Sequence, residues 1–313
     1  KFLMNGGLYR GVKPVMWSTV EKTALAEAEI EYHEHRSTTI YVRFPVDNTE
    51  IDELKNSNII IWTTTPWTIP GNRAVAYKGD LKYLLIEVVS IKENSIAKIS
   101  DKIIVAEELL DSFIDETSIE KFNIKLKLEG KELEGTILKH PLFDKGYDFE
   151  VPLLEADFVT TEQGTGFVHI APGHGADDFE LGREHSLPTP ETVEDDGFLK
   201  ETLPLFGGLH VLRDNEKMAD ILSENACLVG RGTINHSYPH SWRSKAPLIF
   251  RTTPQWFISM DENDLRKKSL KSISDTNFFP SQGAKRLSSM IKSRPDWCIS
   301  RQRAWGVPIG IFY

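Results

Sequence analysis

The sequence is poor in cysteine and has no long apolar run. Its 313 residues contain two cysteines, Cys227 and Cys298, which lie far apart in the chain. Two distant cysteines build no disulfide framework, so a reducing compartment is expected. No secretory signal and no apolar segment long enough to cross a bilayer is found. We therefore expect a cytoplasmic protein with no membrane partner.

Positive charge is also scarce, but it is unevenly distributed. The chain has 37 Lys and Arg against 46 Asp and Glu, a formal net charge of −9. Between Arg251 and Arg303 there are 11 basic and 5 acidic residues, so this part is +6 and the first 250 residues are −15. A polyanion would lie along the C-terminal part, and only a short single-stranded end would enter the acidic body. The alternative is that these charged residues form a solvent-exposed surface that binds no polyanion.

The pattern of apolar residues predicts an α+β fold. Short β-branched runs outnumber helical patterns, which favours a β-rich core, closed or nearly closed, with helices on its outside. Strands are expected at 41–45, 58–62, 81–90, 126–138, 153–161 and 166–170. Helices are expected at 103–113, 118–122, 177–185 and 217–224, with helix-like composition also after residue 22 and a long loop near 186–208.

The segment 164–180, GTGFVHIAPGHGADDFE, is the best candidate for an active site. It reads as a strand, a glycine-rich turn and a helix N-terminus, an order that lets a ligand approach the backbone closely. His169, His174 and Asp178 could contact a polar ligand there. The alternative is structural, with His169 a satisfied core histidine and Asp178 a helix cap.

A threonine run provides a second candidate. Side chains alternate faces along a strand, so Thr63 and Thr65 should point one way and Thr64 the other. Pro66 lacks an N–H donor and should end the strand, leaving hydroxyls and backbone groups at an edge. A plain edge strand would have the same pattern.

Four long segments, taken together, resemble class I isoleucyl-tRNA synthetases. They are WTTTPWTIPGNRAVAY (62–77), GTGFVHIAPGHGADD (164–178), HSYPHSWRSKAPLIFRTTPQWF (236–257) and RPDWCISRQRAWGVPIG (294–310), in this order. The threonine run followed by Pro-Trp is similar to the isoleucyl form, whereas the valyl and leucyl relatives carry an arginine-containing variant there. The resemblance extends from about Leu8 to the end of the chain.

The resemblance implies an inserted editing region with the stalk that joins it to the synthetic domain. The implied fold is a closed or nearly closed barrel of about six strands with peripheral helices and a two-segment stalk. The implied parts are an N-terminal stalk at 1–38, the editing domain at 39–235, and the second stalk with the start of the second catalytic half at 236–313. The HIGH and KMSKS signatures are absent, so ATP and Mg²⁺ are expected only in a longer enzyme. A chain starting at Lys1 is expected to be an excised, monomeric fragment.

The implied activity is proofreading, that is, hydrolysis of Val-tRNA(Ile). A pocket discriminates by only about 1–3 kcal/mol against a ligand lacking one methylene, a limit for which isoleucyl-tRNA synthetases are themselves the standard example. A second site that admits valine and excludes isoleucine removes the error. No GxSxG elbow and no cysteine occur in the motifs, so attack by a positioned water is expected rather than an acyl-enzyme.

Site residues follow from the same resemblance. Asp178 matches the acidic residue that holds the α-ammonium group, and His169 the wall that blocks isoleucine. The threonines would hold the terminal ribose and position the water, with Thr63, Thr64, Thr65 and Asp178 as the catalytic set. Substrate-binding roles are expected for His169, Trp62, Trp67, Thr68, Tyr238, Gly164, Thr165 and Gly166, the aromatic residues offering flat surfaces to the adenosine.

No metal is expected. Many relatives have zinc-binding CxxC pairs in the stalk, where this chain has Ser18, Glu21, Ser241 and Ser244. Serine binds Zn²⁺ poorly, so the stalk should be held by packing and hydrogen bonds.

Two rival hypotheses stay open. One is a metal-dependent hydrolase using His169, His174, Asp177 and Asp178. The other is a tRNA-binding stalk whose editing pocket is inactive without the remaining protein.

Overall fold

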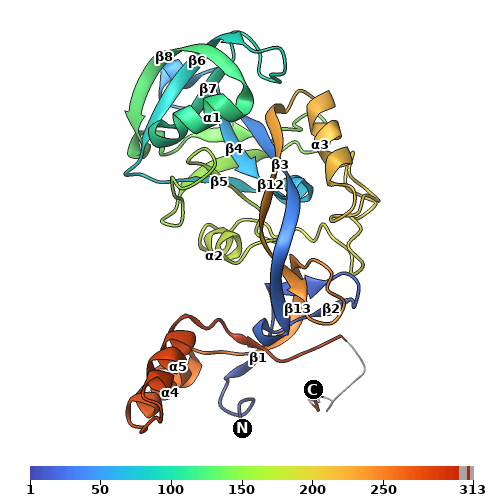
Figure 1. Cartoon of the computed structure of the whole chain (residues 1–313), viewed down its shortest axis with the longest axis vertical. Helices are drawn as coiled ribbons and strands as arrows, with labels where there is room; N and C mark the ends of the chain where they lie inside the picture. Colours follow the sequence, from blue (N-terminus) through green and yellow to red (C-terminus); the bar gives the residue numbers. More distant parts are fainter. Residues whose placement is uncertain (303–308, 311–313) are drawn as a thin grey trace.

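The computed structural model describes residues 1–302 together with residues 309 and 310. The upper lobe carries most of the strands, a two-stranded ribbon descends from it, and a small sheet with a helical hairpin lies at the lower end (Figure 1). The segment 294–310, the last of the four that carry the resemblance, is thus described only in part, since residues 303–308 lie outside the described residues.

The upper lobe is built on a ten-stranded mixed sheet. Its order is β11-β5-β10-β9-β3-β4-β7-β6-β8, with β12 also paired to β3. The strands are β3 (Ile30–Asn48), β4 (Asn58–Thr63), β5 (Ala74–Tyr77), β6 (Lys82–Ile91), β7 (Lys102–Ala106), β8 (Ile119–Glu129), β9 (Ile137–Lys139), β10 (Glu150–Glu155), β11 (Val168–Ile170) and β12 (Leu228–Ser241). Runs such as Ile59–Ile61 are fully buried between neighbouring strands, as β-branched residues on a pleated surface should be.

The predicted barrel of about six strands is wrong, because no sheet in the described residues closes. The two terminal strands of the path, β11 and β8, do not pair with each other. A barrel needs every strand to pair along both edges. β11 has only three residues and ends two positions before Pro172. β8 exposes lysines such as Lys121 and Lys125, and charged side chains of this kind protect a strand edge from further pairing. The sheet therefore stays open.

A second sheet of four strands forms the lower part. Its order is β14 (Trp297–Cys298), β13 (Ile249–Ile258), β1 (Leu8–Ser18) and β2 (Thr23–Ala24). The long strands β3 and β12 join the two parts as an antiparallel ribbon that pairs from Ile30 with Ser241 up to Val42 with Leu228. The predicted boundaries at 38/39 and 235/236 fall within this ribbon and stay a prediction.

The helices lie on the outside of the sheets (Figure 1). They are α1 (Leu110–Thr117), α2 (Ala176–Glu184), α3 (Asn215–Glu224), α4 (Leu265–Ser274) and α5 (Gln282–Ser293). Short 3₁₀ turns are η1 (Glu27–Glu29), η2 (Asp52–Leu54), η3 (Pro66–Gly71), η4 (Glu107–Leu109), η5 (Gly130–Leu133) and η6 (Glu262–Asp264). None of the described helices has the length and apolarity needed to span a membrane.

Three helix predictions are corrected by the structure. The segment of helix-like composition after residue 22 forms β2, the short turn η1 and the start of β3. Residues 119–122 belong to strand β8, and the predicted helix at 103–113 begins as strand β7. Ile103, Ile104 and Val105 are β-branched and pair with β6, whose long edge offers hydrogen bonds that a short helix would not. In these short segments, pairing with a neighbouring strand therefore overrides the helical preference that the residue composition suggests.

Candidate active site

A small half-open cavity lies where β4, η3, β11 and the start of α2 meet. Its volume is about 150 Å³, below the roughly 300–1,000 Å³ of pockets for drug-sized ligands. It therefore has room for one amino-acid-sized group. The wall residues are Trp62, Thr63, Thr65, Thr68, Val168, His169, Ala171, His174 and Asp178.

The structure brings the two candidate segments together at this cavity. Thr63 ends β4 and Thr65 precedes η3, while Asp178 lies in the first turn of α2. More than 100 residues of chain separate the hydroxyls from the carboxylate, so only the fold makes them neighbours. Thr64, predicted as part of the catalytic set, is not in the wall. β4 ends at Thr63, so Thr64 and Thr65 lie beyond the strand and the predicted alternation of faces does not extend to them.

His169 is a buried, neutral wall residue with a defined tautomer. Its Nδ1 lies 2.9 Å from Nδ2 of Asn72, which also lies 2.8 Å from the carbonyl oxygen of Ala74. An amide nitrogen only donates, so Nδ1 accepts and Nε2–H donates to Oγ1 of Thr68 at 2.8 Å. Burial lowers the pKa of His169 to about 3, with smaller contributions from neighbouring histidines. The ring therefore holds one fixed orientation.

The three wall threonines form a connected hydroxyl network. Thr68 receives the His169 proton and donates its own to the carbonyl oxygen of Thr65 at 2.8 Å. Oγ1 of Thr63 accepts from the backbone N–H of Thr65 at 3.1 Å, and the hydroxyls of Thr63 and Thr65 are 3.1 Å apart. The Thr68 hydroxyl proton is thus committed within the protein, whereas Thr63 and Thr65 can direct a hydroxyl into the cavity.

The carboxyl group of Asp178 has no positively charged side chain beside it in the cavity wall. Burial raises its pKa to about 6, although the backbone N–H of Ala171, which donates to Oδ2 at 2.8 Å, acts in the opposite direction. None of the nine wall residues is lysine or arginine. A ligand ammonium group would supply the missing positive charge and favour the carboxylate.

His174, which the sequence suggested as a possible contact for a polar ligand, lines the cavity. Nδ1 lies 3.0 Å from the carbonyl oxygen of Phe250 in β13 and must donate to it, so Nε2 accepts from the hydroxyl of Thr192 at 2.6 Å. Burial lowers its pKa to about 4. The histidine thus ties the cavity wall to the lower sheet.

A metal site has no support among the described residues. No group of three or more His, Cys, Asp or Glu within them is placed to hold a metal ion. Both ring nitrogens of His169 and of His174 already have hydrogen-bond partners. The metal-dependent hydrolase is therefore not favoured by this geometry.

Several predicted ligand contacts lie outside the wall. Trp67 is buried behind His174, with ring centroids 4.9 Å apart. Tyr238 lies on the β3/β12 ribbon, 4.9 Å from the ring of His35. The structure does not bring either side chain to the cavity.

Gly164, Thr165 and Gly166 support the cavity from behind. The hydroxyl of Thr165 donates to the carbonyl oxygen of Ile60 in β4 at 2.6 Å, and Tyr83 donates to that of Gly166 at 2.8 Å. Gly166 has a φ of +77°, and a Cβ there would lie 2.3 Å from Ala106. Glycine is therefore required for this close approach.

Sequence reasoning missed Asn72, Val168 and Ala171. Val168 and Ala171 flank His169 and line the cavity. Asn72 is fully buried and orients His169, although it does not itself form the wall. The sequence gives little indication of this role, because Asn72 is a single polar residue directly after the proline-containing turn η3.

The four stalk positions that lack cysteine do meet in space. Glu21 accepts hydrogen bonds from Ser18 and, at 3.1 Å, from Ser241 of the other stalk segment. Oγ of Ser241 also accepts from the backbone N–H of Ser244 at 3.4 Å. Hydroxyls and one carboxylate do not match the sulfur and nitrogen ligands typical of structural zinc. That the stalk needs no zinc stays a prediction.

Comparison with known proteins identifies the class. The family "tRNA synthetases class I (I, L, M and V)" matches residues 1–313. The chain therefore belongs to the class I tRNA synthetases. Within that class, the isoleucine–tRNA ligases of Pelagibacter ubique (strain HTCC1062) and Gluconobacter oxydans (strain 621H) are 54% and 52% identical to it, over 312 and 326 residues. These relatives confirm the isoleucyl resemblance.

The chain spans about a third of those relatives, since the matches cover 100% of this chain and 34% of each relative. Among solved structures, "GlLeuRS-CP1" gives a TM-score of 0.48 at 13% identity, covering 62% of this chain and 98% of that one. The cytosolic leucyl-tRNA synthetase editing domain of P. falciparum gives 0.47 at 11% identity, covering 62% and 99%.

Proposed function

We propose that this chain is the editing part of an isoleucyl-tRNA synthetase. Its cavity would hydrolyse the ester between valine and the terminal ribose of tRNA(Ile). Its partners would be that charged tRNA and the remainder of the synthetase, in the cytoplasm, with the chain itself a monomer. The observation that carries the proposal is the single small cavity shared by Asp178, His169 and the threonine hydroxyls.

Asp178 would bind the α-ammonium group of the aminoacyl ester. Asp178 is half-buried, its carboxyl group has a raised pKa, and no lysine or arginine lies beside it in the wall. A charge-assisted contact in such surroundings is stronger than a neutral hydrogen bond. It would also exclude acyl groups that lack a free amine.

His169 would set the size limit of the side-chain pocket. Its ring is held on both nitrogens by Asn72 and Thr68, so it cannot turn away to admit a longer side chain. Exclusion by a fixed wall can reject isoleucine more strongly than attraction can select valine, because overlap is costlier than a lost methylene contact.

The threonine hydroxyls would hold the terminal ribose and the attacking water. Water attacks the ester carbonyl carbon, the bond from that carbon to the ribose oxygen breaks, and a proton from the water ends on the ribose oxygen. His169 is neutral, and its Nε2–H already donates to Thr68. The histidine is therefore not placed as the base, and catalysis would rest on positioning and on hydrogen bonds to the developing oxyanion.

The test is deacylation of Val-tRNA(Ile) and Ile-tRNA(Ile) by excess chain, compared with the spontaneous rates. We expect accelerated loss of valine only. Asp178→Ala should abolish the acceleration, while the melting temperature checks that the variant folds. Binding of tRNA without any accelerated hydrolysis would instead favour the non-enzymatic stalk.

A further inference from the structure

Residues 171–175, which we call the glycine turn, connect β11 to α2 and form part of the cavity wall. Ala171 and His174 both line the cavity. Gly175 is the N-cap of α2, and Asp178 lies in the first turn of that helix. The backbone N–H of Ala171 donates to Oδ2 of Asp178, and the N–H of His174 donates to the carbonyl oxygen of Ala171, each at 2.8 Å. The place of Asp178 in the cavity therefore depends on the shape of the glycine turn.

The glycine turn is bonded to one edge of β13 in the lower sheet. The other edge of β13 pairs with β1. On the edge that faces the turn, the N–H of Thr252 donates to the carbonyl oxygen of Gly173 at 3.0 Å. Nδ1 of His174 donates to the carbonyl oxygen of Phe250, also at 3.0 Å. β14 pairs with this edge only near the far end of β13, so the glycine turn takes the place of a neighbouring strand here.

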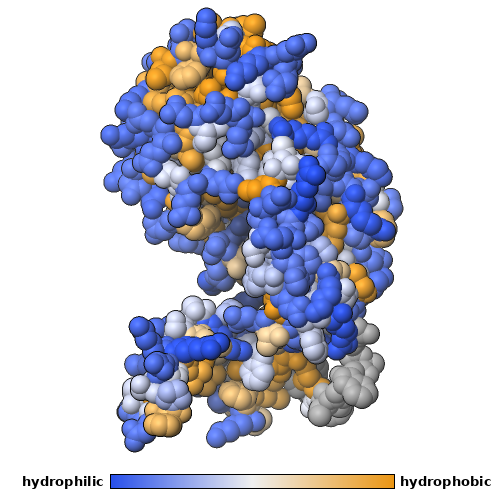
Figure 2. Space-filling view, viewed as in Figure 1, coloured by the Kyte–Doolittle hydropathy of each residue, from blue (hydrophilic) through white to orange (hydrophobic). Residues whose placement is uncertain are grey.

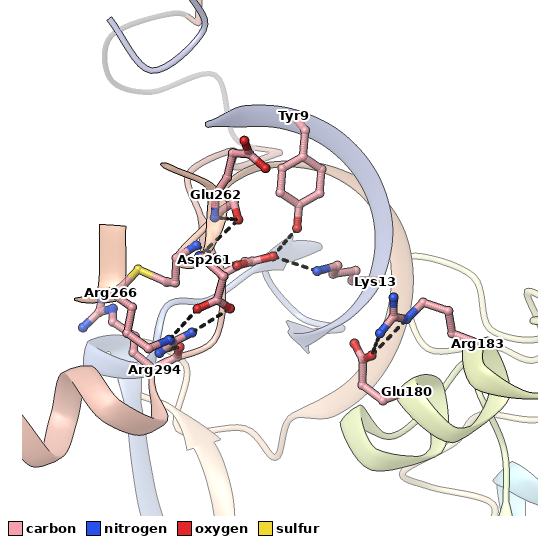
Figure 3. Close-up of polar contacts among 11 residues, drawn as sticks. Tyr9, Lys13, Glu180, Arg183, Asp261, Glu262, Arg266 and Arg294 are labelled. Atoms are coloured by element: carbon pink, nitrogen blue, oxygen red, sulfur yellow. Dashed lines mark hydrogen bonds and ion pairs between the residues drawn. The ribbon is translucent and has the colours of Figure 1, made fainter. Parts of the chain in front are cut away.

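Ion pairs do not provide a second link between α2 and the lower sheet. Arg183 pairs with Glu180 inside α2 at 2.5 Å, whereas Lys13 of β1 points to another carboxylate (Figure 3), that of Asp296 at 2.8 Å. No ion pair among the described residues joins α2 to β1 or β13. Figure 2 also shows a deep notch between the upper lobe and the hairpin of α4 and α5. The polar link from the start of α2 to the lower sheet therefore runs through the glycine turn.

Thr192 holds the remaining nitrogen of His174. Because Nδ1 of the ring donates to the lower sheet, Nε2 is the acceptor, and the hydroxyl of Thr192 donates to it at 2.6 Å. Thr192 is only 1% exposed, and its carbonyl oxygen accepts from the N–H of Lys200 at 2.9 Å. A Cβ on Gly173 would lie 3.1 Å from the carbonyl oxygen of Pro190. The segment that carries Thr192 is thus packed closely against the glycine turn.

The same segment is fastened to β1 and β13. Nε1 of Trp17 in β1 donates to the carbonyl oxygen of Asp195 at 2.8 Å. The carboxylate of Asp195 pairs with Arg251 of β13, and the guanidinium group lies 4.7 Å from the ring centre of Trp17. Trp17 and Arg251 are both buried. The two strands that hold the glycine turn therefore also hold the segment that bonds to His174.

We propose that Thr192 is a positioning residue of the cavity. Acting through His174, its hydroxyl fixes the glycine turn and thereby the place at which Asp178 meets a ligand. The effect on hydrolysis rests on the proposed function, whereas the effect on Asp178 does not. Without the Thr192 donor, Nε2 of His174 would be left without a hydrogen bond unless water entered. Loss of this one hydroxyl should therefore loosen the turn and let water reach the carboxyl group.

The test compares Thr192→Val, which keeps the shape but lacks the hydroxyl, with Thr192→Ser, which retains a hydroxyl. Carbon-13 NMR follows the titration of Asp178, whose pKa should fall from about 6 toward the ordinary 3.8 in Thr192→Val and stay near 6 in Thr192→Ser. Single-turnover hydrolysis of Val-tRNA(Ile) at saturation should slow by about 10- to 100-fold in Thr192→Val, because a small misplacement costs up to about 100-fold. The half-saturating concentration should change little, since most of the tRNA lies outside the cavity.

The matched control is Thr117→Val. Its hydroxyl is equally buried, at 2% exposure, but donates within α1 to the carbonyl oxygen of Phe113 at 2.6 Å. This variant should change neither the titration nor the rate. Equal effects of the two valine variants would overturn the proposal, and so would an unchanged titration of Asp178 in a folded Thr192→Val.

Two further outcomes are distinguishable. If the unaltered chain does not hydrolyse Val-tRNA(Ile), the proposed function fails, and the titration of Asp178 still decides the role of Thr192. If Thr192→Val does not fold, Asp195→Asn replaces it, because the side chain of Asp195 is 64% exposed and its loss of charge weakens the pair with Arg251. The pKa of Asp178 should then fall by a smaller amount, and an unchanged titration would overturn the proposal.

Discussion

Asn72 donates a hydrogen bond of 2.9 Å to Nδ1 of His169, and this contact decides which nitrogen of the ring carries the proton. The same amide nitrogen donates to the carbonyl oxygen of Ala74. If the Asn72 amide were flipped, its Oδ1 would lie against that carbonyl oxygen, and two acceptors cannot form a hydrogen bond. The His169 proton is thereby directed at Thr68 and into the threonine network. A residue outside the cavity wall thus controls the wall's hydrogen bonding.

Replacing Asn72 by aspartate should reverse that tautomer. A carboxylate accepts only, so Nδ1 would become the donor and Nε2 would no longer donate to Thr68. Ring-nitrogen chemical shifts of His169 would detect the change directly, and discrimination between valyl and isoleucyl esters should weaken. Asn72→Ala is the control, since it removes the donor without demanding reversal. Identical nitrogen shifts in Asn72→Asp and the unaltered chain would refute the assignment.

His169→Ala should allow hydrolysis of Ile-tRNA(Ile). Removing the ring enlarges a cavity of about 150 Å³ next to Val168 and Ala171, which makes space for the extra methylene. Deacylation of both charged tRNAs, followed side by side, measures the effect. Valine should still be released, because Asp178 and the threonines remain. If Ile-tRNA(Ile) stays untouched by a folded variant, His169 is not the barrier.

Alanine at Thr65 should slow deacylation more than alanine at Thr64. Thr65 lies in the cavity wall and bonds with Thr63 and Thr68, whereas Thr64 lies outside the wall. Losing one hydrogen-bond donor to the transition state costs about 2.7–4 kcal/mol, or roughly 100- to 1,000-fold in rate. Single-turnover rates of the two variants provide the comparison. The reverse order would mean that the opposite face of the strand meets the substrate.

Asp178 should make folding stability depend on pH in a predictable direction. Its folded pKa of about 6 exceeds the ordinary 3.8, so the folded chain holds this proton up to a higher pH than the unfolded chain. Lowering the pH from about 7 to about 4 should therefore stabilise the unaltered chain relative to Asp178→Asn, by at most about 3 kcal/mol.

Urea unfolding of both chains across this pH range would measure the effect. The comparison with Asp178→Asn matters because His169 and His174 have lowered pKa values and act in the opposite direction as pH falls. Taking the difference between the two chains removes their contribution. A difference in free energy of unfolding that does not vary with pH would contradict the buried, protonatable carboxyl group.

The sequence by itself was sufficient for the family and for the order of strand, turn and helix at 164–180. These are local properties, set by neighbouring residues and by the two-residue repeat of a strand. The sequence did not predict that residues 119–122 form a strand or that the large sheet stays open. There the outcome depended on which distant strand was available to pair, and short segments of mixed composition do not encode that.

Only the tertiary structure decided how the site is supported. His169 is oriented by Asn72 from 97 positions away, and His174 by Phe250 from 76 positions away. Tyr238, which the motif favoured as a ligand contact, is instead placed on the ribbon beside His35. Residue types and motif spacing indicate which groups can take part in the chemistry. Which of them share a cavity, and which nitrogen carries a proton there, depends on long-range contacts that exist only once the sheets have formed.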